Sequence, residues 1–405
     1  MQYFINFSIL RSNRNYNLLF WGQSISFLGT MITSVALPYQ IYHQTHSTLM
    51  VGLLSLCQLL PLLVTALLGG VLADRHHRRR LLLIAESLLA LGCLLLATNA
   101  MPTFFNMSTL FIVASLMSAI NGLHRPALDS ITQQLVTKND FAIVGTLSTF
   151  THSIGMIAGP AIGGLIIAHF DLVTTYLIDF VTFFISVIAI TMINGIPKPN
   201  RMHDQSTWQA LKQGFQYAKS RQELLGSYFV DFFAMVFGMP MALFPAIAQN
   251  YGGVKTLGLF YSAPAVGAVV IAFFSGWTKQ IKHYGAAIAI AASLWGVAII
   301  FFGFSTHLWL ALFFLSLAGG FDAISGIFRQ ILWNATIPTE YRGRLSGIEM
   351  ISYLSGPKLG DTEAGLIASA FGITASVVSG GFLCVFSVAL CCYFLPKFWK
   401  FRSET

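Results

Sequence analysis

The chain has 405 residues, of which 55% are hydrophobic and only 9% are charged. Soluble globular proteins carry about 25% charged residues, so this composition excludes a soluble protein and indicates one embedded in lipid. The formal net charge of +8 would suit a nucleic-acid partner, and that alternative depends on where the basic residues lie.

Twelve apolar segments follow one another along the chain, each long enough to span a bilayer. A spanning helix needs about 20 apolar residues, and solid apolar runs favour helices over the alternating pattern of a β-barrel. The predicted spans are 16–42, 49–73, 81–100, 107–136, 141–169, 172–195, 224–249, 254–277, 285–305, 308–335, 344–370 and 373–395. The sequence therefore predicts an all-α membrane protein with twelve transmembrane helices.

The basic residues fall in alternate loops between these spans. Only Lys255 lies in a loop on one side, and Lys358 lies within a span. The other side receives Arg11, Arg14, Arg75, Arg78, Arg79, Arg80, Arg125, Lys138, Lys198, Arg201, Lys212, Lys219, Arg221, Lys279, Lys282, Arg329, Arg342, Arg344, Lys397, Lys400 and Arg402. Because positive charge marks cytoplasmic loops, we expect both termini in the cytoplasm and interpret the net charge as topological, without a nucleic-acid partner.

The central segment 196–223 differs from its flanks. It is polar, contains Pro197 and Pro199, and includes an amphipathic stretch from Trp208 to Tyr217. We predict a cytoplasmic linker with an interfacial helix. It would separate an N-terminal six-helix bundle (1–195) from a C-terminal one (224–405).

The two halves share spacings of glycine and proline. An 18-residue glycine interval in the second span (Gly52 to Gly70) recurs in the eighth (Gly258 to Gly276). The stretch 159–163, Gly-Pro-Ala-Ile-Gly, recurs at 356–360 as Gly-Pro-Lys-Leu-Gly. Such recurrence indicates a duplicated six-helix unit, which many transporters use for alternating access to a site at the membrane midplane.

The loop after the second span carries the sequence Gly70-Val71-Leu72-Ala73-Asp74-Arg75, followed by Arg78 and Arg79. It resembles the loop motif of the major facilitator superfamily. The resemblance implies a conformational latch, in which Gly70 allows close helix packing and Asp74 meets the N-terminus of a neighbouring helix. The alternative is that the arginines only anchor the topology. His77 replaces the second glycine of that motif.

A second glycine-rich motif lies in the fifth span. It consists of Gly155, Gly159, Pro160, Gly163 and Gly164. It resembles the motif typical of exporters in the superfamily, with small residues for tight packing and a proline that permits a bend. Glycine-rich membrane helices are common, so plain packing is the alternative.

Further stretches, Thr45 to Thr48, Val51 to Leu53 and Arg342 to Arg344, resemble the bacterial exporter subgroup that contains the enterobactin (siderophore) exporter. Multidrug and macrolide efflux proteins belong to the same subgroup. The resemblance implies two pseudo-symmetric six-helix bundles of the major facilitator superfamily fold, in a bacterial inner membrane.

Polar residues at membrane depth are expensive and are therefore candidates for function. In the superfamily, spans one, four, seven and ten line the cavity, which implies roles in proton coupling or substrate binding for Gln23, Asn121, His124, Asp231 and Asp322.

The eleventh span adds Lys358, Asp361 and Glu363, and at about 100° per residue Lys358 and Asp361 lie close enough in angle to pair. Either a salt bridge or proton coupling would explain that pair. In the third span we expect Glu86 to snorkel or act structurally. In the sixth span Asp179 is either a functional candidate or the partner of a neighbouring hydroxyl.

These features predict a secondary exporter of a small organic molecule driven by proton antiport, and the resemblance implies a siderophore as the substrate. A multidrug or macrolide efflux pump is the alternative, followed by a nutrient importer. No phosphate-binding Gly-x-x-x-x-Gly-Lys-Ser/Thr loop occurs in the chain, and no catalytic cluster suggests an enzyme. We expect a monomer in the bilayer with protons and a small molecule as partners, and neither a cofactor nor a metal site.

Overall fold

The computed structural model describes residues 7–75, 77–195 and 207–402, and every regular element within those ranges is helical. The side chains of some helical residues, including 70–75, lie outside this description. Among the described residues, 11 helices are long and apolar enough to cross a membrane. The one predicted span not among these 11 helices is the eleventh, α14 (Thr339–Phe371), which is long enough but carries Lys358, Asp361 and Glu363. The predicted twelve-helix, all-α membrane fold is therefore confirmed.

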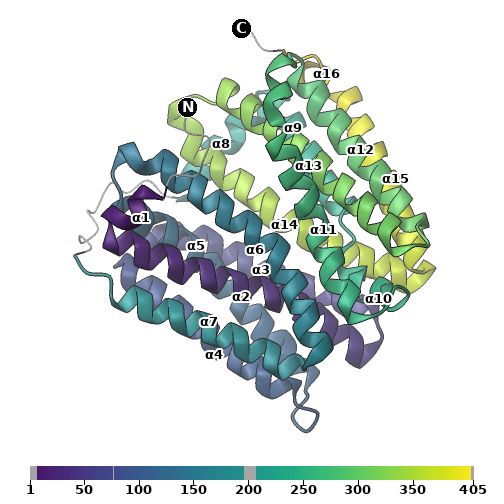
Figure 1. Cartoon of the computed structure of the whole chain (residues 1–405). Helices are drawn as coiled ribbons and strands as arrows, with labels where there is room; N and C mark the ends of the chain where they lie inside the picture. The colour runs from purple at the N-terminus through teal and green to yellow at the C-terminus, as the bar shows by residue number, and fades with distance from the viewer. Residues whose placement is uncertain (1–6, 76, 196–206, 403–405) are drawn as a thin grey trace. The chain divides into compact units, whose positions relative to one another are not determined.

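The first six spans follow the predicted order (Figure 1). After the short α1 (Ser8–Ser12) come α2 (Arg14–Thr45), α3 (Thr48–Arg75), α4 (Arg78–Ala100), α5 (Met107–Leu135), the short η1 (Lys138–Asp140), α6 (Phe141–His169) and α7 (Leu172–Thr191). Side chains cap the N-termini of α5 and α7, among others. Asn106 accepts from the Thr109 N–H at the start of α5, and Asp171 accepts from the Thr174 N–H at the start of α7.

The second half begins with α8 (Thr207–Lys219), in the segment where an amphipathic helix is predicted. It continues through α9 (Gln222–Phe237), η2 (Met241–Leu243), α10 (Phe244–Gln249), α11 (Val254–Phe273), η3 (Ser275–Gln280), α12 (Tyr284–Phe304), α13 (Leu308–Thr336), α14, α15 (Ile373–Phe394) and α16 (Pro396–Trp399). The continuous span predicted at 224–249 is wrong in one respect, because it is interrupted between α9 and η2. Pro240 has no N–H and disfavours helical backbone at the residue before it, which ends α9 early.

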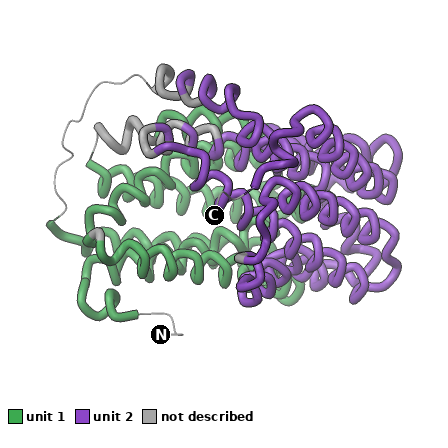
Figure 2. The backbone as a smooth tube through the Cα atoms, turned by 90° about the horizontal axis from the view of Figure 1, so that it is seen from above, with its two compact units in different colours: residues 1–41, 57–203 green, residues 42–56, 204–405 purple. Residues whose placement is uncertain are grey.

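The chain forms two compact units (Figure 2). Unit 1 consists of residues 1–41 and 57–203, and unit 2 of residues 42–56 and 204–405. In unit 2, Tyr217 on α8 donates a hydrogen bond to the Thr336 carbonyl at 3.0 Å, and its ring stacks on Tyr341. The domain boundaries at 195 and 223 stay a prediction.

Each unit uses its glycine-proline motif for close helix packing. In unit 1, a Cβ on Gly163 would lie 3.1 Å from the Ile32 carbonyl of α2. In unit 2, a Cβ on Gly360 would lie 2.6 Å from the Met235 carbonyl of α9. The fifth span thus packs on the first as the eleventh packs on the seventh, which agrees with the internal repeat.

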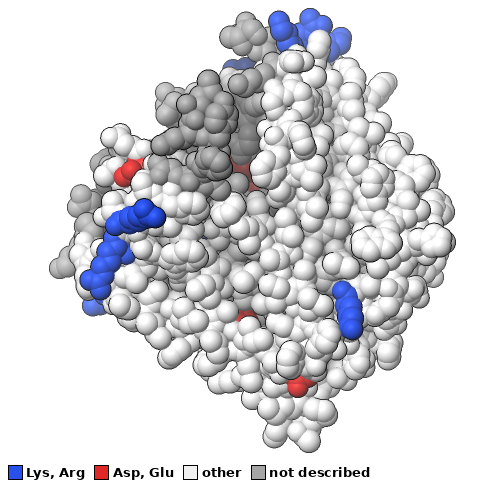
Figure 3. Space-filling view, in the orientation of Figure 1, with Lys and Arg blue, Asp and Glu red and all other residues white. Residues whose placement is uncertain are grey.

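The surface suits lipid. Figure 3 shows a face on which most side chains are neither acidic nor basic. Large apolar side chains point outward from several helices, with Phe273, Trp309 and Phe371 each more than 70% exposed. Soluble monomers rarely expose apolar surface so widely, so the bilayer is the medium that covers it.

Candidate functional site

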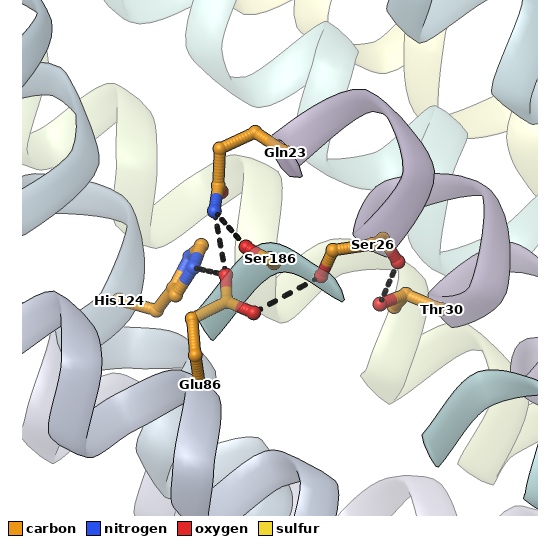
Figure 4. A network of polar contacts seen from close by, with 6 residues as sticks. All are labelled: Gln23, Ser26, Thr30, Glu86, His124 and Ser186. Carbon is orange, nitrogen blue, oxygen red and sulfur yellow. Dashed lines mark hydrogen bonds and ion pairs between the residues drawn. The ribbon is translucent and has the colours of Figure 1, made fainter. Parts of the chain in front are cut away.

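A network of polar side chains surrounds Glu86 inside unit 1 (Figure 4). Glu86 lies on α4 and is fully buried. Its Oε1 atom accepts a hydrogen bond from Gln23 Nε2 on α2 at 2.6 Å and lies 2.8 Å from His124 Nε2 on α5. Its Oε2 atom accepts from the Ser26 hydroxyl at 3.3 Å, and Gln23 also donates to Ser186 on α7 at 2.9 Å. Side chains of α2 and α5 therefore meet at a carboxylate of α4, and Ser186 of α7 joins the network through Gln23.

This network corrects one expectation and extends others. Glu86 does not snorkel, because its side chain has no exposed surface. Gln23 and His124, both predicted as candidates from their spans, meet at Glu86, whereas Asn121 is exposed on α5. The sequence analysis named Glu86 but not its partners. An acidic residue in an otherwise apolar span is costly unless polar partners satisfy it, and this cost was the available signal.

A second fully buried carboxylate in unit 1 is that of Asp179 on α7. Its Oδ2 atom accepts from the Thr33 hydroxyl at 2.5 Å and from the Cys93 thiol at 3.3 Å. Its Oδ1 atom accepts from Thr182 at 3.0 Å. Asp179 therefore pairs with neighbouring hydroxyls, which is one of the two alternatives considered from the sequence.

In unit 2, Arg329 on α13 lies between two acidic residues. It forms an ion pair with Asp231 on α9, and its Nη2 atom is 3.6 Å from Asp322 Oδ1 on the same helix. Glu349 on α14 also acts on Arg329 electrostatically. The carboxylates of Asp231 and Asp322 thus share one guanidinium, and the carboxylate of Glu349 adds to the negative charge around it. This excess of negative charge favours a proton or a cationic group, and loss of that charge would free the guanidinium for an anion.

Sequence reasoning did not foresee the buried partners of Arg329. We expected it among the cytoplasmic residues that mark topology, but its side chain is only 12% exposed and is paired inside unit 2. The predicted candidates Asp231 and Asp322 are brought together by it. Seven residues separate Asp322 from Arg329, which places them two turns apart on one helix face, and that spacing was the available signal.

The charges of α14 lie beside the interruption of the seventh span. Asp361 Oδ1 accepts from the Ala242 N–H at 2.8 Å, and Oδ2 accepts from the Ser55 hydroxyl of α3, also at 2.8 Å. Lys358 acts on Asp361 electrostatically, and Glu363 is partly buried two residues further on. Whether Lys358 and Asp361 act only as a charge pair or in coupling stays open.

Side chains from two other helices bind backbone carbonyls exposed by the interruption. Trp295 on α12 donates to the Gly238 carbonyl at 3.0 Å, and Tyr261 on α11 donates to the Met241 carbonyl at 3.0 Å. Irregular backbone at membrane depth is tolerated only where protein groups satisfy it. With Asp361, these residues hold a broken helix in place.

The predicted latch is only partly within view. The side chains of Gly70, Asp74 and Arg75 lie outside the described residues. Arg79 donates from Nε to the Ile190 carbonyl at 3.0 Å and binds the Thr191 carbonyl as well. It therefore caps the C-terminus of α7, where a cation is favoured. The latch itself stays a prediction.

The exporter motif lies on the face of α6 that meets α2. Gly155, Gly159, Pro160, Gly163 and Gly164 are all buried. A Cβ on Gly155 would overlap the Phe27 ring, and one on Gly159 would overlap the Met31 side chain. The motif brings two helices together, and its role in export stays a prediction.

The profile of the transmembrane secretion effector family, a branch of the major facilitator superfamily (MFS_3), matches residues 6–403. The chain belongs to this family. The MFS_3 match covers almost the whole chain, so this protein is a multi-pass membrane transporter of the exporter type that carries a small molecule.

Similarities to individual proteins support this family assignment. The chain is 26% identical to the enterobactin exporter EntS of Shigella boydii serotype 18, and the alignment covers 98% of this chain and 96% of that protein. The enterobactin exporter EntS of Escherichia coli O1:K1 is 25% identical with the same coverage. Among solved structures, a bacterial homologue of the human lysosomal transporter Spinster gives a TM-score of 0.76 at 13% identity, covering 98% of this chain and 99% of that one. This last likeness supports the fold alone.

Proposed function

We propose that this protein exports a siderophore across the bacterial inner membrane by proton antiport. The observation that carries the proposal is the end-to-end similarity to the enterobactin exporters, at 25–26% identity over 98% of the chain. The family supports the direction of transport, and the relatives support the substrate class. Metal-free siderophores such as enterobactin are the first substrates to test.

Proton antiport is supported by the carboxylates at membrane depth. Glu86 and Asp179 in unit 1, and Asp231, Asp322, Asp361 and Glu363 in unit 2, lie in helices that otherwise suit lipid. Acidic residues in such helices mark proton or ion pathways in many transporters. Alternating access between the two sides, with a monomer as the working unit and both termini in the cytoplasm, completes the proposal.

The test compares a deletion strain with its complemented parent under iron starvation. We expect less iron-chelating activity in the spent medium of the deletion strain, and metal-free chelator retained inside its cells. Complementation with the intact gene should restore secretion.

Two other outcomes would replace the proposal. Unchanged secretion together with altered resistance to macrolides or dyes would indicate a multidrug efflux pump. Unchanged secretion together with impaired uptake of a nutrient would indicate an importer.

A further inference from the structure

The networks around Glu86 and Asp179 are two of three polar layers that lie between α2, α4 and α7, and we call these layers together the polar seam. A third layer follows the first two. Tyr176 on α7 donates to Gln40 Oε1 on α2 at 2.7 Å, and Gln40 Nε2 lies 3.3 Å from Asn99 Oδ1 on α4. Along α2 the three layers recur every seven residues, at Ser26, Thr33 and Gln40. Residues seven apart lie on one face of a helix, so the layers stack along a single line.

The seam is long, and the side chains along its middle have no exposed surface. From Ser26 to Gln40 it extends for about 21 Å at ~1.5 Å per residue, or about two thirds of a hydrocarbon core of ~30 Å. Gln40, Glu86, Asp179 and Tyr176 are each 0% exposed. Both ends come close to the surface. At one end His124 keeps 15% of its side chain exposed, and at the other Asn99 donates to the Asn106 carbonyl, beside the exposed turn at 101–104.

The chemistry of the seam suits a group that gains and loses a proton. The contacts of Asp179 come from hydroxyls and a thiol, and those of Glu86 from an amide, a hydroxyl and an imidazole. Each of these groups can serve as donor or acceptor, so a carboxyl group keeps its hydrogen bonds in either protonation state. The two carboxylates also act on each other electrostatically. Beyond His124, the charged neighbours Arg125 and Asp129 lie on α5.

Packing alone does not require such residues. The corresponding spans of unit 2 are α9, α12 and α15, and neither α12 nor α15 contains an acidic residue. Where they meet, a Cβ on Gly296 would lie 2.9 Å from the Gly381 carbonyl, and Ala292, Ile299 and Val388 are buried nearby. Small and apolar residues therefore build the contact between α12 and α15, which corresponds to the contact between α4 and α7 in unit 1.

We propose that the seam of unit 1 carries the coupled protons, with Glu86 and Asp179 as their binding groups. This inference rests on the proposed proton antiport and gives it a location inside the N-terminal bundle. A proton entering beside Asn99 would bind Asp179 and leave through Glu86 and His124.

The first test needs no substrate. Infrared difference spectra of the purified transporter in lipid nanodiscs, recorded between acidic and alkaline pH, should show the carbonyl band of a protonated carboxyl group. Glu86→Gln and Asp179→Asn should each remove part of that band, and the double variant should remove both parts. Asp171→Asn is the matched control on α7, because Asp171 is an exposed N-cap and asparagine caps equally well. A band that neither variant changes overturns the proposal, whatever the substrate is.

The second test follows transport. In everted vesicles with enterobactin as probe, Glu86→Gln and Asp179→Asn should abolish accumulation driven by a pH gradient while leaving equilibration down a concentration gradient. Full gradient-driven accumulation by the double variant at normal abundance overturns the proposal. Wild-type vesicles that do not transport enterobactin would instead count against the proposed substrate, since the infrared result stands apart from it.

A milder pair of variants guards against misfolding. Thr33→Val removes the hydroxyl that donates to Asp179 and nearly keeps its shape, whereas Thr33→Ser keeps the hydroxyl. Because that bond stabilises the charged carboxylate, Thr33→Val should move the pH midpoint of the infrared band upward, and Thr33→Ser should not. Equal midpoints in wild type and both variants would show that Asp179 does not titrate and overturn its assignment.

Discussion

The carboxylate of Asp361 on α14 accepts a hydrogen bond from the backbone N–H of Ala242 at 2.8 Å, at the point where the seventh span is interrupted. An N–H at a helix break needs an acceptor, because water is absent at that depth. The second oxygen of Asp361 binds Ser55, so one side chain ties together three segments of unit 2. This contact suggests a structural role for Asp361.

The Asp361 contact leads to a prediction for three variants. Asp361→Asn keeps an oxygen for the Ala242 N–H but removes the charge beside Lys358, and Lys358→Gln removes the other charge. A buried charge without its partner destabilises by about 3–5 kcal/mol, so each single change should lower protein abundance. The double variant should recover abundance and gradient-driven transport, as measured by immunoblot and in everted vesicles. An abundant double variant that cannot use a pH gradient would instead make the pair part of the coupling.

The ion pair of Arg329 predicts a large effect of its loss. Arg329→Gln leaves Asp231 and Asp322 without a cation, and we expect destabilisation of about 3–5 kcal/mol. The matched control is Arg221→Gln, since Arg221 is 51% exposed beside Glu223 and such pairs contribute about 0–1 kcal/mol. Thermal unfolding in detergent, followed by tryptophan fluorescence, measures both. Equal melting shifts for the two variants would contradict a buried pair.

Gly29 gives a steric prediction within the seam. A Cβ at Gly29 would overlap the Thr182 hydroxyl and the Asp179 carboxylate. Gly29→Ala should therefore destabilise unit 1 by about 1–3 kcal/mol through overpacking. Gly145→Ala on α6 is the control, because a Cβ there would have no neighbour within 4 Å. A neutral Gly29→Ala variant in the same unfolding assay would show that α2 and α7 separate easily.

The latch motif predicts a functional effect without a loss of protein. Asp74→Asn should preserve abundance, slow turnover and shift cysteine labelling toward an inward-open state. Arg79→Gln should behave differently and lower the melting temperature, because Arg79 caps the end of α7. Normal turnover of the Asp74→Asn variant would exclude Asp74 from the mechanism.

Topology provides an independent check of the charge pattern. A reporter fused after Thr405 should be active only in the cytoplasm, and one inserted in the turn after Thr103 only outside it. This expectation follows from the basic residues that cluster on one side of the predicted membrane. A periplasmic C-terminus would overturn the twelve-span arrangement.

The sequence by itself determined the spans, because hydrophobicity over about 20 residues is a local property that needs no neighbour to express itself. It also determined where two helices pack closely, because a glycine has no side chain to hold the neighbouring backbone away. Gln23, His124, Asp231 and Asp322 were found as polar residues in apolar runs, within the spans that the family resemblance pointed to. That resemblance rests on short local motifs, which can be recognised without knowing how the helices pack.

Tertiary structure alone decided which polar residues meet. Glu86 became the centre of a network only because α2 and α5 turn amide, hydroxyl and imidazole groups toward α4, while Ser186 of α7 accepts a hydrogen bond from the same amide. Arg329 became a buried partner because α9 places Asp231 beside it. The rotation of a helix about its axis is set by packing against its neighbours, and a nearly uniform apolar helix carries little periodic signal to reveal that rotation in advance.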